Sequence, residues 1–456
     1  MKNLYIIIIA LITAVMAKAQ DFTGSWTGLL DLGQAKLNLV FNISLNDNNT
    51  LSCTMDSPDQ GAKGIPANIS IDENNVLSIE VKAIRLIYKG ELKGNNIEGS
   101  FSQAGFTKPL TLHKTTANIL KRPQTPKPPY PYTTEEITFT NPDDGAILSG
   151  TITVHSSNAK SGNSQKVVVM ITGSGQQNRD EELFGHKPFL VIADFLARHG
   201  IATLRYDDRG VGKSTGDFTN ATTQTFKNDA LAAISYLRNN KKFKQIGTLG
   251  HSEGGCISFM IGAEGKSDFV ISLAGSGVRG DSLLVEQNRT ILLMSGYNKQ
   301  TVDNYCHALA LLFEHVINNN TQQETSKWLD DILANNSSLL SLPDNLKSNL
   351  YKVQKSMTTW LRYFISYIPY KDLAGIKCPV FAANGTHDTQ VSATTNLEAI
   401  SKALQYNKNN TIKTYPGLNH LFQHCTTGSV NEYGKIEETI SQELLDDILT
   451  WINSLP

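Results

Sequence analysis

The chain has 456 residues, and its 41 basic and 42 acidic side chains give a net charge of −1 at neutral pH. At roughly 150 residues a domain, this length predicts two or three domains and a large core. The balanced charge provides no global field for nucleic acid or an anionic membrane, which argues against both as partners.

The N-terminus has the three parts of a secretory signal peptide. Met1-Lys2-Asn3 is a short basic start, residues 4–16 are nearly all apolar, and Ala17-Lys18-Ala19 is an A-x-A cleavage site before Gln20. The apolar run is shorter than the ~18 residues of a membrane span, and no cysteine follows the cut. We therefore expect residues 1–19 to be removed from a soluble protein that is exported to the periplasm or the extracellular space.

Residues 20–115 have the alternating pattern of half-buried antiparallel strands. Asparagine-rich turns separate the runs, and the clearest run has apolar side chains at Leu37, Leu39, Phe41, Ile43 and Leu45. This predicts a small β-sandwich or barrel, and Gly24-Ser25-Trp26 weakly resembles lipocalin-like barrels. Such a domain is either a glycan- or lipid-binding module or a structural appendage of the larger C-terminal domain, and we favour the appendage.

Residues 116–134 contain five prolines, which predicts an extended, semi-rigid linker. From residue 135 to residue 456, apolar runs alternate with amphipathic helical patterns, which predicts a mostly parallel, doubly wound sheet. The expected strands lie near residues 167–172, 201–206, 246–250, 269–274, 380–384 and 411–415. Helical spacing without strands at about 280–371 predicts an inserted helical cap.

One motif lies between an expected buried strand and an expected helix. Ile246-Gly247-Thr248-Leu249 runs into Gly250-His251-Ser252-Glu253-Gly254-Gly255, which contains G-x-S-x-G. In this pattern a strained turn exposes the serine hydroxyl, and a side chain two residues to either side would collide with neighbouring backbone. We interpret Ser252 as a nucleophile; the alternative is a chance match to a five-letter pattern.

Two later strands place an acid and a histidine in the order that follows such a serine. Residues 380–385 lead into Asp388, and residues 411–415 lead into His420. An imidazole between a carboxylate and a serine can take the serine proton, so we assign His420 as the base and Asp388 as its orienting acid. A turn or helix-capping role is the alternative for Asp388. Weaker candidates for the base are His424, His387 and His251.

The apolar run at 166–171 leads into Thr172-Gly173-Ser174-Gly175. Glycine lets backbone N–H groups point into a site, so we expect this loop to supply one oxyanion donor, from Ser174 or Gly175. The second donor is expected to be the N–H of Glu253, directly after the serine. An ordinary strand-to-helix turn is the alternative for the loop.

Two other patterns predict no chemistry. Residues 210–214 resemble the end of a phosphate-binding P-loop, but the required first glycine is Asp207, so we expect a structural turn in which Arg209 pairs with neighbouring aspartates. The cysteines show no C-x-x-C spacing, and no cofactor or metal is expected. At most two disulfides can form among Cys53, Cys256, Cys306, Cys378 and Cys425.

Together these motifs resemble those of secreted bacterial serine esterases of the α/β-hydrolase superfamily. The resemblance covers residues 135–456 and is more distant for serine aminopeptidases and prolyl-oligopeptidase-type enzymes. Besides the serine motif, it rests on Asn178-Arg179-Asp180-Glu181, Tyr206-Asp207-Asp208-Arg209, Asn384-Gly385 and Pro416-Gly417-Leu418-Asn419-His420.

The resemblance implies an α/β-hydrolase fold and a serine carboxylesterase that forms an acyl-enzyme intermediate. Its expected substrate is a small-molecule ester with a short acyl chain. Two alternatives stay open: an exopeptidase of the same fold, and a glycan- or lipid-binding protein whose hydrolase domain is inactive.

Overall fold

A computed structural model describes residues 22–33, 36–45, 50–60, 62–72, 74–115, 121–156, 166–318 and 322–456. The expected signal peptide, residues 1–19, lies outside this part of the chain. The chain divides into two compact units, Met1–Lys121 and Arg122–Pro456. Within the described ranges, no helix combines the length and the apolarity needed to cross a membrane.

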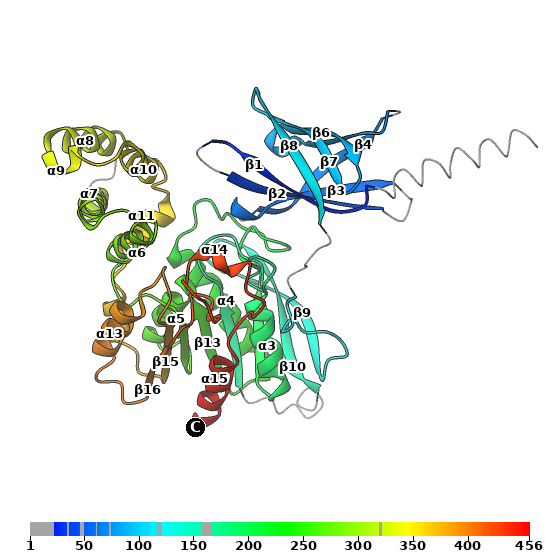
Figure 1. The fold of residues 1–456 in the computed structure, drawn as a ribbon. Helices are drawn as coiled ribbons and strands as arrows, with labels where there is room; N and C mark the ends of the chain where they lie inside the picture. The colour runs from blue at the N-terminus through cyan, green and yellow to red at the C-terminus, as the bar shows by residue number, and fades with distance from the viewer. Residues whose placement is uncertain are drawn as a thin grey trace, which may run out of the picture. The chain divides into compact units, whose positions relative to one another are not determined.

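The first unit is a closed barrel of eight antiparallel strands, coloured blue to cyan in Figure 1. Each strand pairs with the next, and β1 closes the barrel by pairing with β8. The strands are β1 (Gly24–Asp31), β2 (Lys36–Leu45), β3 (Leu51–Ser57), β4 (Ala62–Ile71), β5 (Val76–Val81), β6 (Leu86–Lys93), β7 (Asn96–Gln103) and β8 (Phe106–Thr115).

Large apolar side chains fill the barrel interior. The alternation expected in β2 places Leu39, Phe41 and Ile43 in the core. Trp26 is fully buried, and its Nε1–H donates to the Phe22 carbonyl at 2.7 Å, which satisfies its polar atom. Of the two expected architectures, the barrel is the one that forms, and its interior is a packed core.

The second unit contains an eight-stranded sheet in the order β16-β15-β14-β13-β11-β12-β10-β9. Strands β11 to β16 run parallel and correspond to the six expected strands. Strands β9 and β10 extend the sheet in antiparallel fashion and were not expected. The bounds are β9 (Tyr132–Thr140), β10 (Ile147–His155), β11 (Lys166–Ile171), β12 (Ala202–Tyr206), β13 (Gln245–His251), β14 (Val270–Leu273), β15 (Val380–Gly385) and β16 (Asn410–Tyr415).

Helices cover both faces of this sheet because its central strands are apolar on both sides. In β11, Val168 and Met170 pack with α3 and α15, whereas Val167 and Val169 face α4 and α5. Helix α13 packs with α5 on the second face. The layers are therefore doubly wound, as expected. The helices are α3 (Pro188–Arg198), α4 (Thr223–Asn240), α5 (Glu253–Ala263), α13 (Ala393–Ala403) and α15 (Gln442–Ser454), with the short α14 (Val430–Tyr433).

A group of helices interrupts the sheet between β14 and β15. In Figure 1 the helices α7 to α10 gather to one side of the sheet, and α6 and α11 lie between them and the rest of the unit. The group has its own apolar core around Tyr305, Leu309 and Phe313. Its members are α6 (Gly280–Met294), α7 (Lys299–Asn318), α8 (Gln322–Asn335), α9 (Ser337–Leu340), α10 (Asp344–Lys355), α11 (Thr359–Ser366) and α12 (Pro369–Leu373).

The proline-rich segment is bonded to the second unit over part of its length. The Arg122 guanidinium donates to the carbonyls of Phe184, Gly434 and Ile436 at 2.8–3.0 Å. The Gln124 amide donates to one carbonyl and accepts from two N–H groups in residues 439–440. Strand β9 also begins inside the expected linker, at Tyr132. Residues from Arg122 onward therefore form part of the second unit.

We expect Arg122→Ala to lower the free energy of unfolding by about 2–3 kcal/mol, because three partly buried carbonyls lose a charged donor. Lys127→Ala, at an exposed position of the same segment, is the control and should change it by less than about 0.5 kcal/mol. Urea unfolding of the full chain, followed by tryptophan fluorescence, measures both. Equal effects of the two substitutions would show that the segment is a passive linker.

Candidate active site

The serine motif forms a sharp turn between β13 and α5. Ser252 has φ 54° and ψ −118°, which is rare for a residue with a side chain. A Cβ on Gly250 would lie 1.8 Å from the Gly254 carbonyl oxygen, and one on Gly254 would lie 2.0 Å from the Ile171 oxygen. Both glycines are thus required by close backbone packing, and the turn leaves the Ser252 side chain half-buried at the edge of a pocket.

The structure brings Asp388 and His420 into contact. Asp388 follows β15, His420 follows β16, and the His420 Nδ1–Asp388 Oδ2 distance is 2.7 Å. The other carboxylate oxygen, Oδ1, accepts the N–H groups of Gln390 and Val391 at 2.8 Å each. Asp388 therefore acts both as a turn residue and as the partner of the imidazole. Both side chains are buried.

Ser252 and His420 line one pocket of about 260 Å³. Its remaining walls come from the loop after β11, from α6 and α11, and from the segment after Asp388. They include Ser174, Gln177, Leu183, Leu283, Leu284, Gln287, Trp360, Phe364, Gln390, Val391 and Leu421. Among the hydrogen bonds of the described residues, none joins the Ser252 hydroxyl to the His420 ring. Such contacts are often long in substrate-free enzymes and tighten in the complex.

The other histidines occupy different positions. His424 is exposed, and its Nδ1 lies 2.9 Å from Glu438. His387 is exposed and lies beside the Cys425 sulfur. His251 is buried, with Nδ1 3.0 Å from Glu181 Oε1 and Nε2 2.9 Å from the His420 carbonyl oxygen. None of them contacts the Asp388 carboxylate in the part of the chain that the structure describes.

The loop after β11 is held by buried carboxylates. Gly173 N–H donates to Glu181 at 2.8 Å, while Asp208 accepts from the Thr172 hydroxyl and from Gln177 N–H. Burial raises the pKa of Asp208 to about 8, although these two hydrogen bonds act in the opposite direction. The loop thus enters the site with a fixed backbone, and the Gly173 N–H is already occupied.

The three expected oxyanion donors have free N–H groups. Within the described ranges, the backbone N–H groups of Ser174, Gly175 and Glu253 donate to no protein acceptor. Ser174 lines the pocket that contains Ser252, whereas Gly175 and Glu253 line a small cavity that shares Gly173 with it. Ser174 and Gly175 therefore both stay candidates for the donor that the loop supplies.

The Glu253 side chain points away from bulk solvent and connects three elements. Its Oε1 accepts from the Thr223 hydroxyl at 2.6 Å and from Trp360 Nε1 at 2.8 Å. Burial raises its pKa, and the hydrogen bonds from Thr223, Trp360 and Ser174 oppose that shift. A residue of the serine turn is thereby tied to α11, which the sequence did not predict.

Arg209 does not pair with its neighbours in sequence, so that expectation was wrong. Its guanidinium is buried and bonds to Asp229 of α4 at 2.7–2.8 Å and to Asp144 of the β9–β10 turn at 2.6 Å. Asp207 instead binds Arg179. The turn after β12 is structural, as expected, but its charge pairs are long-range. All five cysteines are free, and Cys256 is buried.

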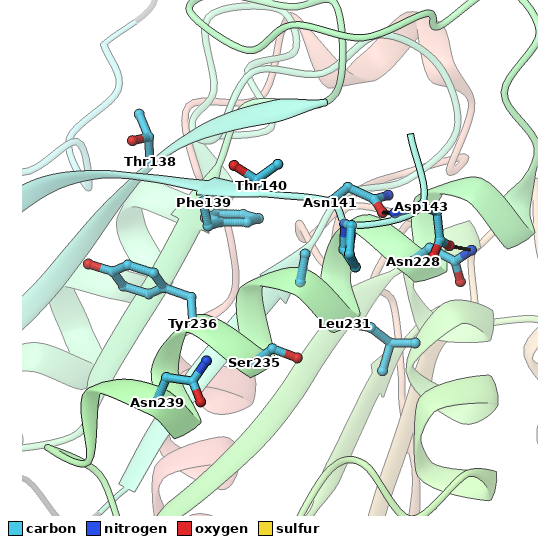
Figure 2. Close-up of a pocket in the computed structure, with 12 residues that line it drawn as sticks. Thr138, Phe139, Thr140, Asn141, Asp143, Asn228, Leu231, Ser235, Tyr236 and Asn239 are labelled. Atoms are coloured by element: carbon cyan, nitrogen blue, oxygen red, sulfur yellow. Dashed lines mark hydrogen bonds between the residues drawn. The ribbon is translucent and has the colours of Figure 1, made fainter. Parts of the chain in front are cut away.

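A larger pocket lies elsewhere in the second unit. Figure 2 shows this pocket of about 580 Å³ between β9 and α4, lined by residues such as Phe139, Leu231 and Tyr236. Neither Ser252 nor His420 borders it. Size alone therefore does not locate the candidate site, whereas the convergence of a strained serine, a buried acid and an imidazole does.

Two sequence comparisons match parts of the chain to known proteins. A family model described as serine aminopeptidase, S33 (Hydrolase_4) matches residues 187–324. Esterase EstD of Thermotoga maritima is 33% identical over 107 residues, which make up 24% of this chain and 26% of EstD. The match thus spans about a quarter of the length of that relative.

Two solved structures are similar at low sequence identity. The Pyrococcus furiosus esterase Pf2001 aligns with a TM-score of 0.41 and 16% identity, covering 71% of this chain and 92% of that one. Est1E from Butyrivibrio proteoclasticus, with ferulic acid bound, aligns with a TM-score of 0.38 and 19% identity, covering 68% and 98%. The family model and EstD support the resemblance to α/β-hydrolase esterases, and the strand order of the second unit is consistent with it.

We expect Gly250→Ala to lower the free energy of unfolding by about 3 kcal/mol, because its Cβ must displace backbone. Gly434→Ala is the matched control. Gly434 has φ −64°, and a Cβ there would meet only ordinary contacts at 3.5 Å or more, so a change within about 0.5 kcal/mol is expected. Thermal or urea unfolding measures both, and a neutral Gly250→Ala would disprove the packing argument.

Proposed function

We propose that this protein is a serine carboxylesterase with Ser252 as nucleophile, His420 as general base and Asp388 as the orienting acid. The observation that carries the proposal is the buried Asp388–His420 contact at 2.7 Å, with His420 and the strained Ser252 bordering one pocket. A hydroxyl becomes an active nucleophile when a neighbouring base, held in orientation by a third group, can take its proton.

In this mechanism the Ser252 hydroxyl oxygen attacks the ester carbonyl carbon while His420 Nε2 takes its proton. Asp388 accepts the Nδ1–H, which keeps Nε2 free to act as the base. The N–H of Glu253 and the N–H of Ser174 or Gly175 stabilise the developing oxyanion. His420 then protonates the departing alcohol, and water activated by the same imidazole releases the acid from Ser252.

The pocket supports a small substrate. Its volume of about 260 Å³ lies just below the ~300–1,000 Å³ typical of small-molecule sites. Leu284, Trp360 and Phe364 contribute apolar walls from α6 and α11. In the proposal these helices serve as the cap, and the acyl group is short, such as acetyl to butyryl.

An aminopeptidase would need an acidic group to hold the substrate ammonium. Glu253 accepts from Thr223 and Trp360, and Glu181 accepts from Gly173 and pairs with His251. Both carboxylates are buried and already engaged. Glu182 lies near Lys187 at 3.5 Å. These contacts favour the ester over the aminoacyl amide as substrate.

Export remains part of the proposal and rests on the signal-peptide pattern of residues 1–19 alone. Determining the N-terminal residue of the mature protein tests it directly, and Gln20 is the expected result.

Ser252→Ala should lower kcat for a short 4-nitrophenyl ester by about four to six orders of magnitude, since the nucleophile is lost. His420→Ala should be comparably severe. His424→Ala should change kcat less than about tenfold, because that ring is exposed and bonded to Glu438. Steady-state kinetics on purified full-length protein tests all three. More than a tenth of wild-type activity in Ser252→Ala contradicts the proposal, and the reverse order of the histidines would reassign the base.

The acyl-chain profile tests the substrate class. With 4-nitrophenyl esters of two to sixteen carbons, we expect kcat/KM of the wild type to peak at two to four carbons. Trp360→Ala should shift the peak to longer chains because it opens a wall of the pocket, whereas Trp360→Phe keeps the ring and should keep the profile. A wild-type peak at long chains, an unchanged profile in Trp360→Ala, or aminoacyl anilide turnover equal to the best ester would each contradict the proposal.

A further inference from the structure

A second histidine and a second acid form a buried pair that lines the pocket of Ser252 and His420. Glu181 and His251 are only 5% and 8% exposed, and the Glu181 Oε1–His251 Nδ1 distance is 3.0 Å. The same Oε1 accepts the Gly173 N–H at 2.8 Å. On its other side, His251 Nε2 lies 2.9 Å from the carbonyl oxygen of His420. The proposed mechanism uses neither side chain.

The partners of His251 determine its protonation. Both ring nitrogens face oxygens that can only accept, a carboxylate and a backbone carbonyl, so both must carry a proton. Burial lowers the pKa of His251, but the charge of Glu181 and the hydrogen bonds to Glu181 and His420 outweigh it, and the net shift is upward. The raised pKa and the two acceptors favour the imidazolium form of His251, paired with Glu181. This form does not compete with His420 for the Ser252 proton.

The pair lies directly next to the residues of the proposed reaction, both along the chain and through its hydrogen bonds. Gly173 precedes Ser174, His251 precedes Ser252, and the carbonyl that His251 binds belongs to His420 itself. A Cβ on Gly173 would lie 3.3 Å from the Ser252 Cβ and 3.4 Å from Glu181 Oε1, so these groups are packed in direct contact. The pair bridges the two loops whose separation sets the geometry of the proposed reaction.

Glu181 is also held in an unusual backbone conformation. Its φ is 51°, in the left-handed region that side chains other than Asn and Asp rarely adopt. Its N–H donates to the Asn178 carbonyl at 2.8 Å, which fixes the turn. Strain of this kind persists where the surroundings over-determine it, and it concentrates at functional sites.

We propose that Glu181 and His251 are positioning residues, whose ion pair fixes the oxyanion loop relative to the backbone of His420. The inference rests on the proposed esterase function. If the pair has this role, changing it lowers the rate of the chemical step, because the pair contacts the loops that hold the reacting groups. A displacement of about 1 Å in such groups can cost about 100-fold in rate.

The test compares Glu181→Gln, His251→Asn and the double variant in the full chain, with a short 4-nitrophenyl ester. Glu181→Gln keeps an oxygen that can accept from Gly173 but removes the charge that holds the imidazolium. We expect each single change to lower kcat about 10- to 100-fold while KM changes less than about threefold. The double variant should be no worse than the poorer single variant, because the two residues act as a unit.

Two controls make the outcome specific. The first control is Glu438→Gln, which alters a Glu–His pair of the same chemistry. Its histidine, His424, is exposed to solvent, so kcat should stay within about threefold of the wild-type value. Each kcat is normalised to the sites titrated by a fluorophosphonate and compared with the folded fraction from circular dichroism. A loss of activity that only follows a loss of folded protein means a structural role and overturns the inference.

Ser252→Ala in the same series separates the two proposals. If Ser252→Ala is inactive and the pair variants retain wild-type kcat, the positioning role is wrong and the esterase assignment stands. If Ser252→Ala retains activity, the esterase mechanism itself fails. Additive losses in the double variant would show that Glu181 and His251 act independently, and would also overturn the inference.

Discussion

The site depends on the close packing of the start of α5 against the end of β11. Gly254 lies so near the Ile171 carbonyl that no Cβ fits between them, and Gly250 is packed as tightly against Gly254. At this contact Ser252 has a positive φ, and the loop after Ile171 lies beside it. The strained Ser252 turn and the expected oxyanion loop thus meet at one close backbone contact. The buried parallel sheet supplies the rigidity that maintains it.

Sequence reasoning succeeded where the signal was local or followed from strand order. The last five residues of β11 and the first four residues of β15 are continuous apolar runs, which is typical of strands that are buried on both faces. Asp388 and His420 are 32 residues apart, yet each follows a parallel strand, and the carboxyl ends of neighbouring parallel strands lie along one edge. Their proximity could therefore be expected, although their assignment as acid and base remains a proposal.

Features that rest on side-chain direction and distant partners could not be predicted. Arg122 lies in a segment whose prolines favour a linker, but its partners are backbone carbonyls. Every residue has such a carbonyl, so the sequence does not indicate which ones Arg122 binds. Arg209 was expected to pair locally and pairs instead with Asp144 and Asp229, which other elements bring to it. His251 was expected to be a weaker candidate for the base, and its bond to the His420 carbonyl follows only from the folded chain.

The proposed oxyanion loop presents an electrostatic problem, because three buried carboxylates hold a loop that is expected to stabilise negative charge. Their surroundings reduce the conflict. Burial raises the pKa of Asp208 to about 8, so this group is mostly protonated at neutral pH, and burial raises the pKa of Glu253 as well. Glu181 raises the pKa of His251, whose ring lies 3.0 Å from it. The acids can therefore fix the loop through hydrogen bonds while adding little net negative charge near the oxyanion.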